Sequence, residues 1–230
     1  MKKFEEIFKR GLIVSCQAPE GEPLSGRGIM ARMALAAEIG GAIGIRANAP
    51  EDIKETKETV SIPVIGIFKK DYPGFEVRIT PTFKEAKAII EVGADAIAID
   101  ATNRPRPKGE TLPSLLEKIR DNFDIPVMAD VSNFEEGVRA VELGVEVVST
   151  TLSGYTSNSK KQSEPDIELV KKLSAQLKIP IVAEGRYWTP EQSVKALKCG
   201  AYLVVVGSAI TRPHLITKHF ADKINSFLKI

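Results

Sequence analysis

The amino-acid sequence predicts a closed (β/α)8 barrel, and three observations support this fold class. Eight apolar runs of strand length alternate with eight stretches of helical periodicity along the 230 residues. An Ile-Pro pair precedes three of the runs, and a glycine precedes those in between. No Gly-x-Gly-x-x-Gly motif follows the first run, which argues against an open doubly wound sheet. We therefore expect a single barrel domain over residues 1–230.

The predicted strands are nearly continuous runs of Val, Ile and Ala, as expected for parallel strands that helices cover. Proline suits the first residue of a strand, and glycine suits the left-handed residue that ends the preceding helix. The eight strands are predicted at residues 12–17, 42–46, 64–69, 96–100, 127–130, 147–151, 181–184 and 203–208.

Helical periodicity fills the segments between these strands. The helix that starts after Thr189 has the plainest signals, because Thr189 suits the N-cap, Pro190 the first helical position and Gln192 the third. The eight helices are predicted at residues 28–39, 50–59, 83–92, 112–122, 134–143, 165–177, 190–198 and 213–228.

Almost every predicted strand is apolar until its last one or two residues, where a polar side chain appears. In a barrel these strand ends meet at one face, the C-terminal mouth, which is where barrel active sites lie. Any one of these residues by itself would be interpreted as a strand edge that turns toward solvent. Together they predict a polar site of balanced charge, composed of Gln17, Arg46, Lys69, Asp100, Asp130, Thr151, Glu184 and Ser208.

The last two predicted strands end in glycine, which is typical of phosphate binding. Gly185 follows the seventh strand, and Gly207 and Ser208 close the eighth, with Arg212 just beyond. Barrels often bind phosphate through backbone N–H groups at this point. The glycines would also suit tight turns, but their joint position favours an anion site that Arg212 completes.

Lys69 and Glu184 are the predicted chemical groups, because a lysine and a glutamate at strand ends suit proton abstraction next to a carbonyl. Burial or a nearby cation such as Arg46 would lower the pKa of Lys69 and make it a base. An ion pair or a Schiff base are the alternatives for Lys69. Lys70 has the opposite strand parity, so its side chain is expected to face away from the site. Glu184 follows an apolar run that favours a raised pKa, and the alternative is a salt bridge to a nearby arginine.

Composition excludes several classes of protein. The net charge of +2 shows no basic excess for nucleic acid, and the apolar runs are too short to span a membrane. Acidic residues near the N-terminus argue against a signal peptide, and two cysteines without motif spacing suit a cytoplasmic protein. The two histidines lie on the last predicted helix, so we expect no metal, although Asp100 and Asp130 leave a magnesium site open. No sequence motif for a nicotinamide or flavin cofactor occurs, so we expect no cofactor.

With these residues identified, the chain resembles the N-acetylmannosamine-6-phosphate 2-epimerases of bacterial sialic acid catabolism over nearly its whole length. That family has a barrel of the ribulose-phosphate-binding type. The resemblance rests on motifs at residues 14–18, 44–48, 66–72, 79–82, 98–102, 128–131, 149–156, 182–186 and 206–213.

The resemblance implies cofactor-free interconversion of N-acetylmannosamine 6-phosphate and N-acetylglucosamine 6-phosphate by inversion at C2. By that similarity Lys69 and Glu184 are the catalytic pair, and the sugar or its phosphate is held by Gln17, Arg46, Asp130 and Arg212. Chemistry agrees, because the ring must open before C2 lies beside an aldehyde and becomes acidic. Which of the pair moves the C2 proton, and which assists ring opening, stays open at this point.

Three other functions remain as alternatives. A ribulose-phosphate 3-epimerase would need strand-end histidines for a metal, a Schiff-base aldolase would use Lys69 covalently, and a silent sugar-phosphate-binding protein would need neither Lys69 nor Glu184. The apolar residues of the segment 210–230 favour a homodimer, although they would also suit closure of the barrel by its last helix. The polar loop 154–163 is interpreted as a lid or as an ordinary flexible loop.

Overall fold

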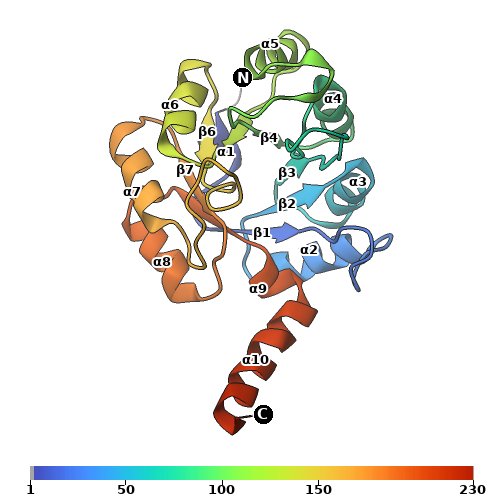
Figure 1. The fold of residues 1–230 in the computed structure, drawn as a ribbon. Helices are drawn as coiled ribbons and strands as arrows, with labels where there is room; N and C mark the ends of the chain where they lie inside the picture. Colours follow the sequence, from blue (N-terminus) through green and yellow to red (C-terminus); the bar gives the residue numbers. More distant parts are fainter. Residues whose placement is uncertain (1–2, 230) are drawn as a thin grey trace.

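Eight parallel strands close into a barrel in which each strand pairs with the next and β8 pairs with β1. The computed structural model describes residues 3–229, and Figure 1 shows the strands surrounded by helices. This confirms the predicted fold class. The strands are β1 (Leu12–Cys16), β2 (Gly44–Asn48), β3 (Val64–Ile67), β4 (Ala96–Asp100), β5 (Val127–Asp130), β6 (Val147–Ser149), β7 (Ile181–Glu184) and β8 (Leu203–Val206).

The eight predicted helices are present, four with the expected bounds and four with bounds that differ by one or two residues. Thr189 caps α8 as predicted, because its side chain accepts a hydrogen bond from the Gln192 backbone N–H at 3.3 Å. The helices around the barrel are α2 (Ile29–Ile39), α3 (Pro50–Thr59), α4 (Phe83–Glu91), α5 (Leu112–Asn122), α6 (Phe134–Glu142), α7 (Ile167–Gln176) and α8 (Pro190–Lys198). Three short helices were not predicted: α1 (Phe4–Ile7), η1 (Pro107–Gly109) and α9 (Ser208–Thr211).

Alternate residues of each strand point into the barrel, and this alternation determines which side chains reach the mouth. Ile65 and Ile67 of β3 belong to the buried cluster inside the barrel, as do Leu203 and Val205 of β8. Outward residues such as Ile45 of β2 and Val64 of β3 pack instead against the helices. Continuing the inward parity past the strand ends brings Lys69 and Gly207 to the mouth.

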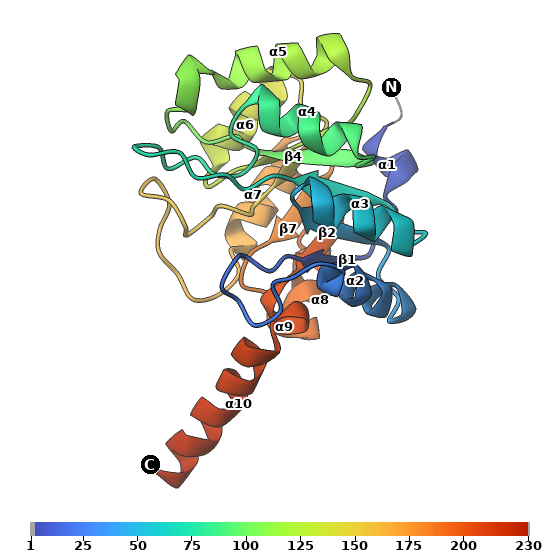
Figure 2. The same cartoon turned by 90° about the vertical axis from the view of Figure 1, so that its right-hand side faces the viewer.

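Helix α1 closes the end of the barrel opposite the mouth. The rings of Phe4 and Phe8 stack with their centroids 4.7 Å apart, and both side chains are fully buried in the cluster inside the barrel. The Tyr202 hydroxyl donates to the Phe8 carbonyl at 2.9 Å. Figure 2 shows α1 on one side of the molecule and the long loops that follow the strands on the other.

The predicted ends of five strands were wrong. β1 and β6 end at Cys16 and Ser149, earlier than predicted. β2 continues to Asn48, so Arg46 is an interior residue rather than the last one. β3 ends at Ile67, and Lys69 pairs with Ile79 in an antiparallel bridge at the base of a small hairpin, residues 68–79. Pro73 and the left-handed Gly74 (φ 81°) form the turn of that hairpin. β8 ends at Val206, and Ser208 begins α9.

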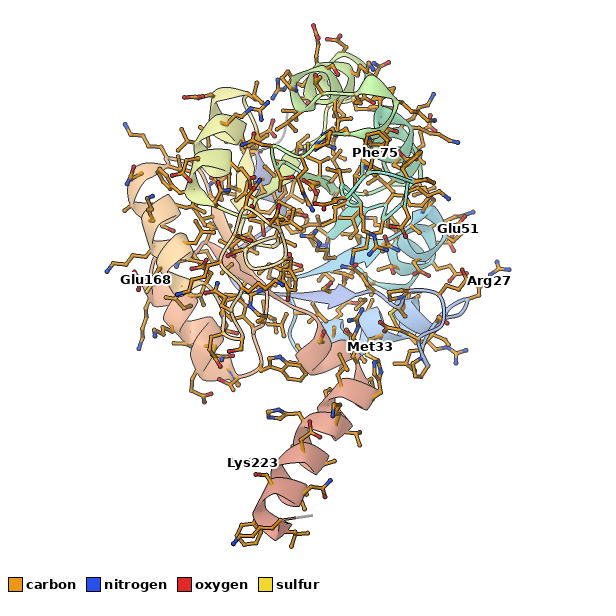
Figure 3. The ribbon with its side chains drawn as sticks, in the orientation of Figure 1. Arg27, Met33, Glu51, Phe75, Glu168 and Lys223 are labelled. Atoms are coloured by element: carbon orange, nitrogen blue, oxygen red, sulfur yellow. The ribbon has the colours of Figure 1, made fainter. Side chains whose placement is uncertain are left out.

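Helix α10 (Pro213–Leu228) extends away from the barrel as a separate arm, as Figures 1 and 2 show. Its bounds are those predicted, but none of its described side chains is buried. Figure 3 shows its side chains, including the labelled Lys223, spreading from the arm on every side. Therefore α10 does not pack as the outer helix of its own barrel. Within residues 3–229, none of the helices combines the length and apolar character that crossing a membrane demands.

Candidate active site

A cavity of about 1040 Å³ opens at the C-terminal ends of the strands. Seven of the nine residues predicted to perform the chemistry or hold the substrate line it: Gln17, Lys69, Glu184, Gly185, Gly207, Ser208 and Arg212. The remaining two, Arg46 and Asp130, do not reach the cavity wall and lie buried next to Glu184. The parallel strands thus bring residues from all parts of the chain to one mouth, as the barrel fold requires.

Arg46 holds two carboxylates beneath the cavity. Its side chain is 1% exposed, and its Nη2 lies 2.5 Å from Asp130 Oδ2. Its Nη1 lies 3.1 Å from Asp130 Oδ1 and 2.6 Å from Glu184 Oε2. The bidentate contact with Asp130 fixes the guanidinium plane, and the same guanidinium contacts Glu184.

Thr151 joins the two carboxylates from the cavity side. Its Oγ1 lies 2.7 Å from Asp130 Oδ1 and 3.1 Å from Glu184 Oε2. The sequence indicated only that Thr151 is a polar residue at a strand end, although its hydroxyl contacts Glu184 directly.

Lys69 enters the cavity from the base of the hairpin 68–79. Its backbone N–H donates to Asn48 Oδ1 at 2.8 Å, while its side-chain amine makes no hydrogen bond or ion pair to the chain between residues 3 and 229. Burial, followed by repulsion from Arg46, lowers the pKa of Lys69 from 10.5 to about 8, although Glu184 works against this shift. Asn48 was missed because the predicted second strand stopped before it.

Burial is also the main cause of the raised pKa of Glu184. Attraction to Arg46 opposes the rise, and repulsion from Asp130 adds to it. An amine with a lowered pKa and a carboxyl with a raised pKa therefore line one cavity. Groups perturbed in opposite directions are typical of acid–base catalysis.

The ends of β7 and β8 lie together on the cavity wall, where the anion site was predicted. Gly185 adopts φ 114°, a conformation that side chains rarely tolerate, and Gly207 precedes the first turn of α9. The first N–H groups of a helix have no partner inside the helix. Arg212 contacts Glu22 at 2.9 Å and lines the same part of the cavity.

Gln17 donates from Nε2 to Ser15 Oγ at 2.7 Å, and its buried Oε1 has no partner within the part of the chain that the structure describes. Asp100 is paired with Arg104 at 2.7 Å rather than directed toward Asp130. Across residues 3–229 no group of three or more His, Cys, Asp and Glu side chains is arranged to hold a metal ion.

Comparisons with known proteins agree with this geometry. A family model described as "Putative N-acetylmannosamine-6-phosphate epimerase" matches residues 30–226. The chain belongs to this family. A relative from Caldanaerobacter subterraneus subsp. tengcongensis, named "Putative N-acetylmannosamine-6-phosphate 2-epimerase", is 56% identical over 218 residues, which cover 94% of this chain and 92% of the relative. A relative of the same name from Clostridioides difficile is 50% identical and covers 94% of this chain and 96% of its own.

A solved structure of another member of the family shows the same architecture. The N-acetylmannosamine-6-phosphate 2-epimerase from Clostridium perfringens superposes with a TM-score of 0.93 at 48% identity, covering 96% of each chain. A thiamine phosphate pyrophosphorylase from Pyrococcus furiosus superposes with a TM-score of 0.58 at 18% identity, over 88% of this chain and 87% of the other, and shares only the fold.

Proposed function

We propose that the protein is an epimerase that interconverts N-acetylmannosamine 6-phosphate and N-acetylglucosamine 6-phosphate in amino-sugar catabolism. The observation that supports this most directly is the meeting of Lys69 and Glu184 in one cavity, with pKa values shifted toward neutrality in opposite directions. Membership of the family supports the substrate, because its relatives carry this activity in their names.

The first chemical step is opening of the sugar ring. Burial raises the pKa of Glu184, which suits a group that donates a proton, and ring opening is assigned to it. Its carboxyl group gives a proton to the ring oxygen and takes one from the anomeric hydroxyl, which leaves an aldehyde at C1. Arg46 and Thr151 hold Glu184 in place through contacts of 2.6 Å and 3.1 Å.

The second step is proton transfer at C2. The neutral amine of Lys69 takes the C2 proton, and the electrons move into an enolate with its charge on the C1 oxygen. The ammonium so formed stabilises that charge. Rotation of the open chain turns the other face of C2 to Lys69, and return of the proton inverts the centre.

The phosphate is placed at the ends of β7 and β8. Gly185, Gly207 and Ser208 line the cavity beside Arg212, and helix N-termini attract anions. Arg212 exchanges its half-buried contact with Glu22 for the phosphate. Gln17 has a buried oxygen without a partner and completes the sugar site.

Substitution of Lys69 tests the scheme. Lys69→Ala should lower kcat by about 100- to 10,000-fold, the range for loss of a general base. Lys70→Ala removes the other lysine that lines the cavity and should leave kcat nearly unchanged. Proton NMR in deuterium oxide should show exchange at C2 during turnover of the wild type. Near-normal epimerisation by Lys69→Ala, or turnover without C2 exchange, would exclude this mechanism. Borohydride trapping of a substrate adduct would favour the aldolase alternative.

We also infer that the protein forms a homodimer through α10. Phe220 and Phe227 of this arm are 65% and 84% exposed. Ile39 of α2 and Val194 of α8 are exposed apolar residues on the two helices beside the point where the arm leaves the barrel (Figure 1). We propose that the arm of each copy covers this face of the other copy.

The unpaired thiols of Cys16 and Cys199 support a reducing, cytoplasmic setting.

A further inference from the structure

The loop between β6 and α7, residues 153–164, lies beside the barrel mouth (Figure 2). Ser159 Oγ accepts hydrogen bonds from the backbone N–H of Gly154 at 2.8 Å and of Thr156 at 3.3 Å. Ser153 Oγ donates to Asp166 Oδ2 at 2.6 Å, which ties the start of the loop to the N-cap of α7. The loop is therefore a defined structure with a fixed base.

Arg186 bridges the two ends of this loop. Its Nη1 donates to the Ser153 carbonyl at 2.8 Å, and its Nε donates to the Glu164 carbonyl at 2.9 Å. The guanidinium is packed closely, because a Cβ added at Gly154 would lie 2.9 Å from Nη1. Arg186 itself has a left-handed backbone (φ 62°), directly after the left-handed Gly185.

The same guanidinium holds an aromatic side chain at the cavity wall. It lies 4.8 Å from the centroid of the Tyr155 ring. Tyr155 is 60% exposed and lines the cavity together with Glu184 and Gly185. An exposed ring on a defined loop, stacked against an arginine at the mouth of a polar cavity, suits contact with the C–H groups of a sugar.

We propose that Arg186 is a positioning residue that holds the loop 153–164 closed at its base and so fixes Tyr155 as a binding wall for the sugar. This rests on the proposed function for the identity of the sugar phosphate. Tyr155 contributes to binding of the substrate and not to proton transfer, because Lys69 and Glu184 perform the chemistry.

Steady-state kinetics separate binding from chemistry. Tyr155→Ala and Arg186→Lys should each raise KM about tenfold, which is the loss expected for one aromatic contact, with kcat changed by less than about threefold. Lysine keeps the charge but lacks the planar fork that reaches two carbonyls. Tyr155→Phe keeps the ring and should retain the wild-type KM. Lys160→Ala, on the same loop and outside the active-site cavity, is the control.

Two measurements do not depend on activity. Trp188 is the only tryptophan of the chain and lines the cavity, so its fluorescence reports binding of N-acetylmannosamine 6-phosphate. The dissociation constant should rise about tenfold in Tyr155→Ala and Arg186→Lys. Trypsin should cleave after Lys160 or Lys161 faster in Arg186→Ala than in the wild type, at unchanged thermal stability.

Several results would overturn the inference. An unchanged KM in either Tyr155→Ala or Arg186→Lys would do so, as would a Tyr155→Phe variant as impaired as Tyr155→Ala, or unchanged tryptic cleavage in Arg186→Ala. The proposed function fails separately, if the wild type does not exchange the C2 proton. In that case the Trp188 titration and the cleavage rates still decide whether Arg186 and Tyr155 form the binding wall.

Discussion

Arg46 sets the charges around the cavity, because it contacts both Asp130 and Glu184 from below. Lys69 shares this environment without a side-chain partner between residues 3 and 229. Burial and repulsion by Arg46 therefore favour its neutral form, with a pKa of about 8. A single buried guanidinium thus holds the proposed acid in place and activates the proposed base.

The pH dependence of the reaction follows from this shift. Only the neutral amine of Lys69 accepts a proton, so deprotonation of Lys69 at about pH 8 should raise kcat/KM, whereas deprotonation of Glu184, which donates a proton in ring opening, should lower it. With an ordinary pKa of 10.5 the rise would continue well beyond pH 9. The profile should be measured from pH 6 to 10. A rate that shows no ascending limb near pH 8 would argue against Lys69 as the base.

Removal of Arg46 should destabilise the fold. Arg46→Met leaves Asp130 and Glu184 buried without their cation, and breaking a buried pair in this way costs about 3–5 kcal/mol. The free energy of unfolding should be measured with urea. Arg27→Met removes an exposed arginine that contacts Glu55 and should change stability little. Equal stability of the two variants would contradict the structural role given to Arg46.

Two elements outside the regular βα units shape the barrel. The hairpin 68–79 carries Lys69 to the cavity, and helix α1 closes the opposite end. The sequence predicted the βα units because their apolar periodicity and caps are local signals. It did not predict the hairpin, although Tyr72-Pro-Gly-Phe75 is a turn signal with proline and glycine in the preferred positions. No turn residue interrupts the sequence Ile67-Phe-Lys-Lys70, so the sequence did not indicate that β3 ends at Ile67.

Helix α1 tests whether the two ends of the barrel are independent. Phe8→Ala should lower the free energy of unfolding by about 3–5 kcal/mol, as for other buried phenylalanines. Because Phe8 closes the end opposite the cavity, kcat of the folded variant should stay close to that of the wild type. Chemical unfolding and kinetics below the unfolding transition check both expectations. A large loss of kcat would show that the two ends are coupled.

For the whole molecule, the arm α10 is the feature that the barrel alone does not explain. The apolar residues of the C-terminal segment were expected either to close the barrel or to join two copies. The structure leaves Phe220 and Ile224 exposed, at 65% and 54%, which favours the second possibility. Burial of such residues between copies would provide the hydrophobic stabilisation that they lack in one chain.

Charged substitutions on the arm test the homodimer. Phe220→Asp combined with Ile224→Asp should convert the protein to monomers in sedimentation experiments, because burying two carboxylates at an apolar interface is unfavourable. Lys223→Ala, on the same helix, is the matched control and should remain dimeric. A monomeric wild type, or a double variant that stays dimeric, would contradict the proposed interface.

The sequence by itself determined the eight βα units, most of their bounds and the chemical types at the strand ends, because periodicity, capping and strand parity act between near neighbours. Strand parity also favoured Lys69 over Lys70 as the inward lysine, although both line the cavity. Only the tertiary structure decided that Arg46 and Asp130, which are 84 residues apart in the chain, pair beneath the cavity, and that α10 leaves the barrel. Those features depend on contacts between distant segments, and local sequence patterns do not record which distant side chains meet.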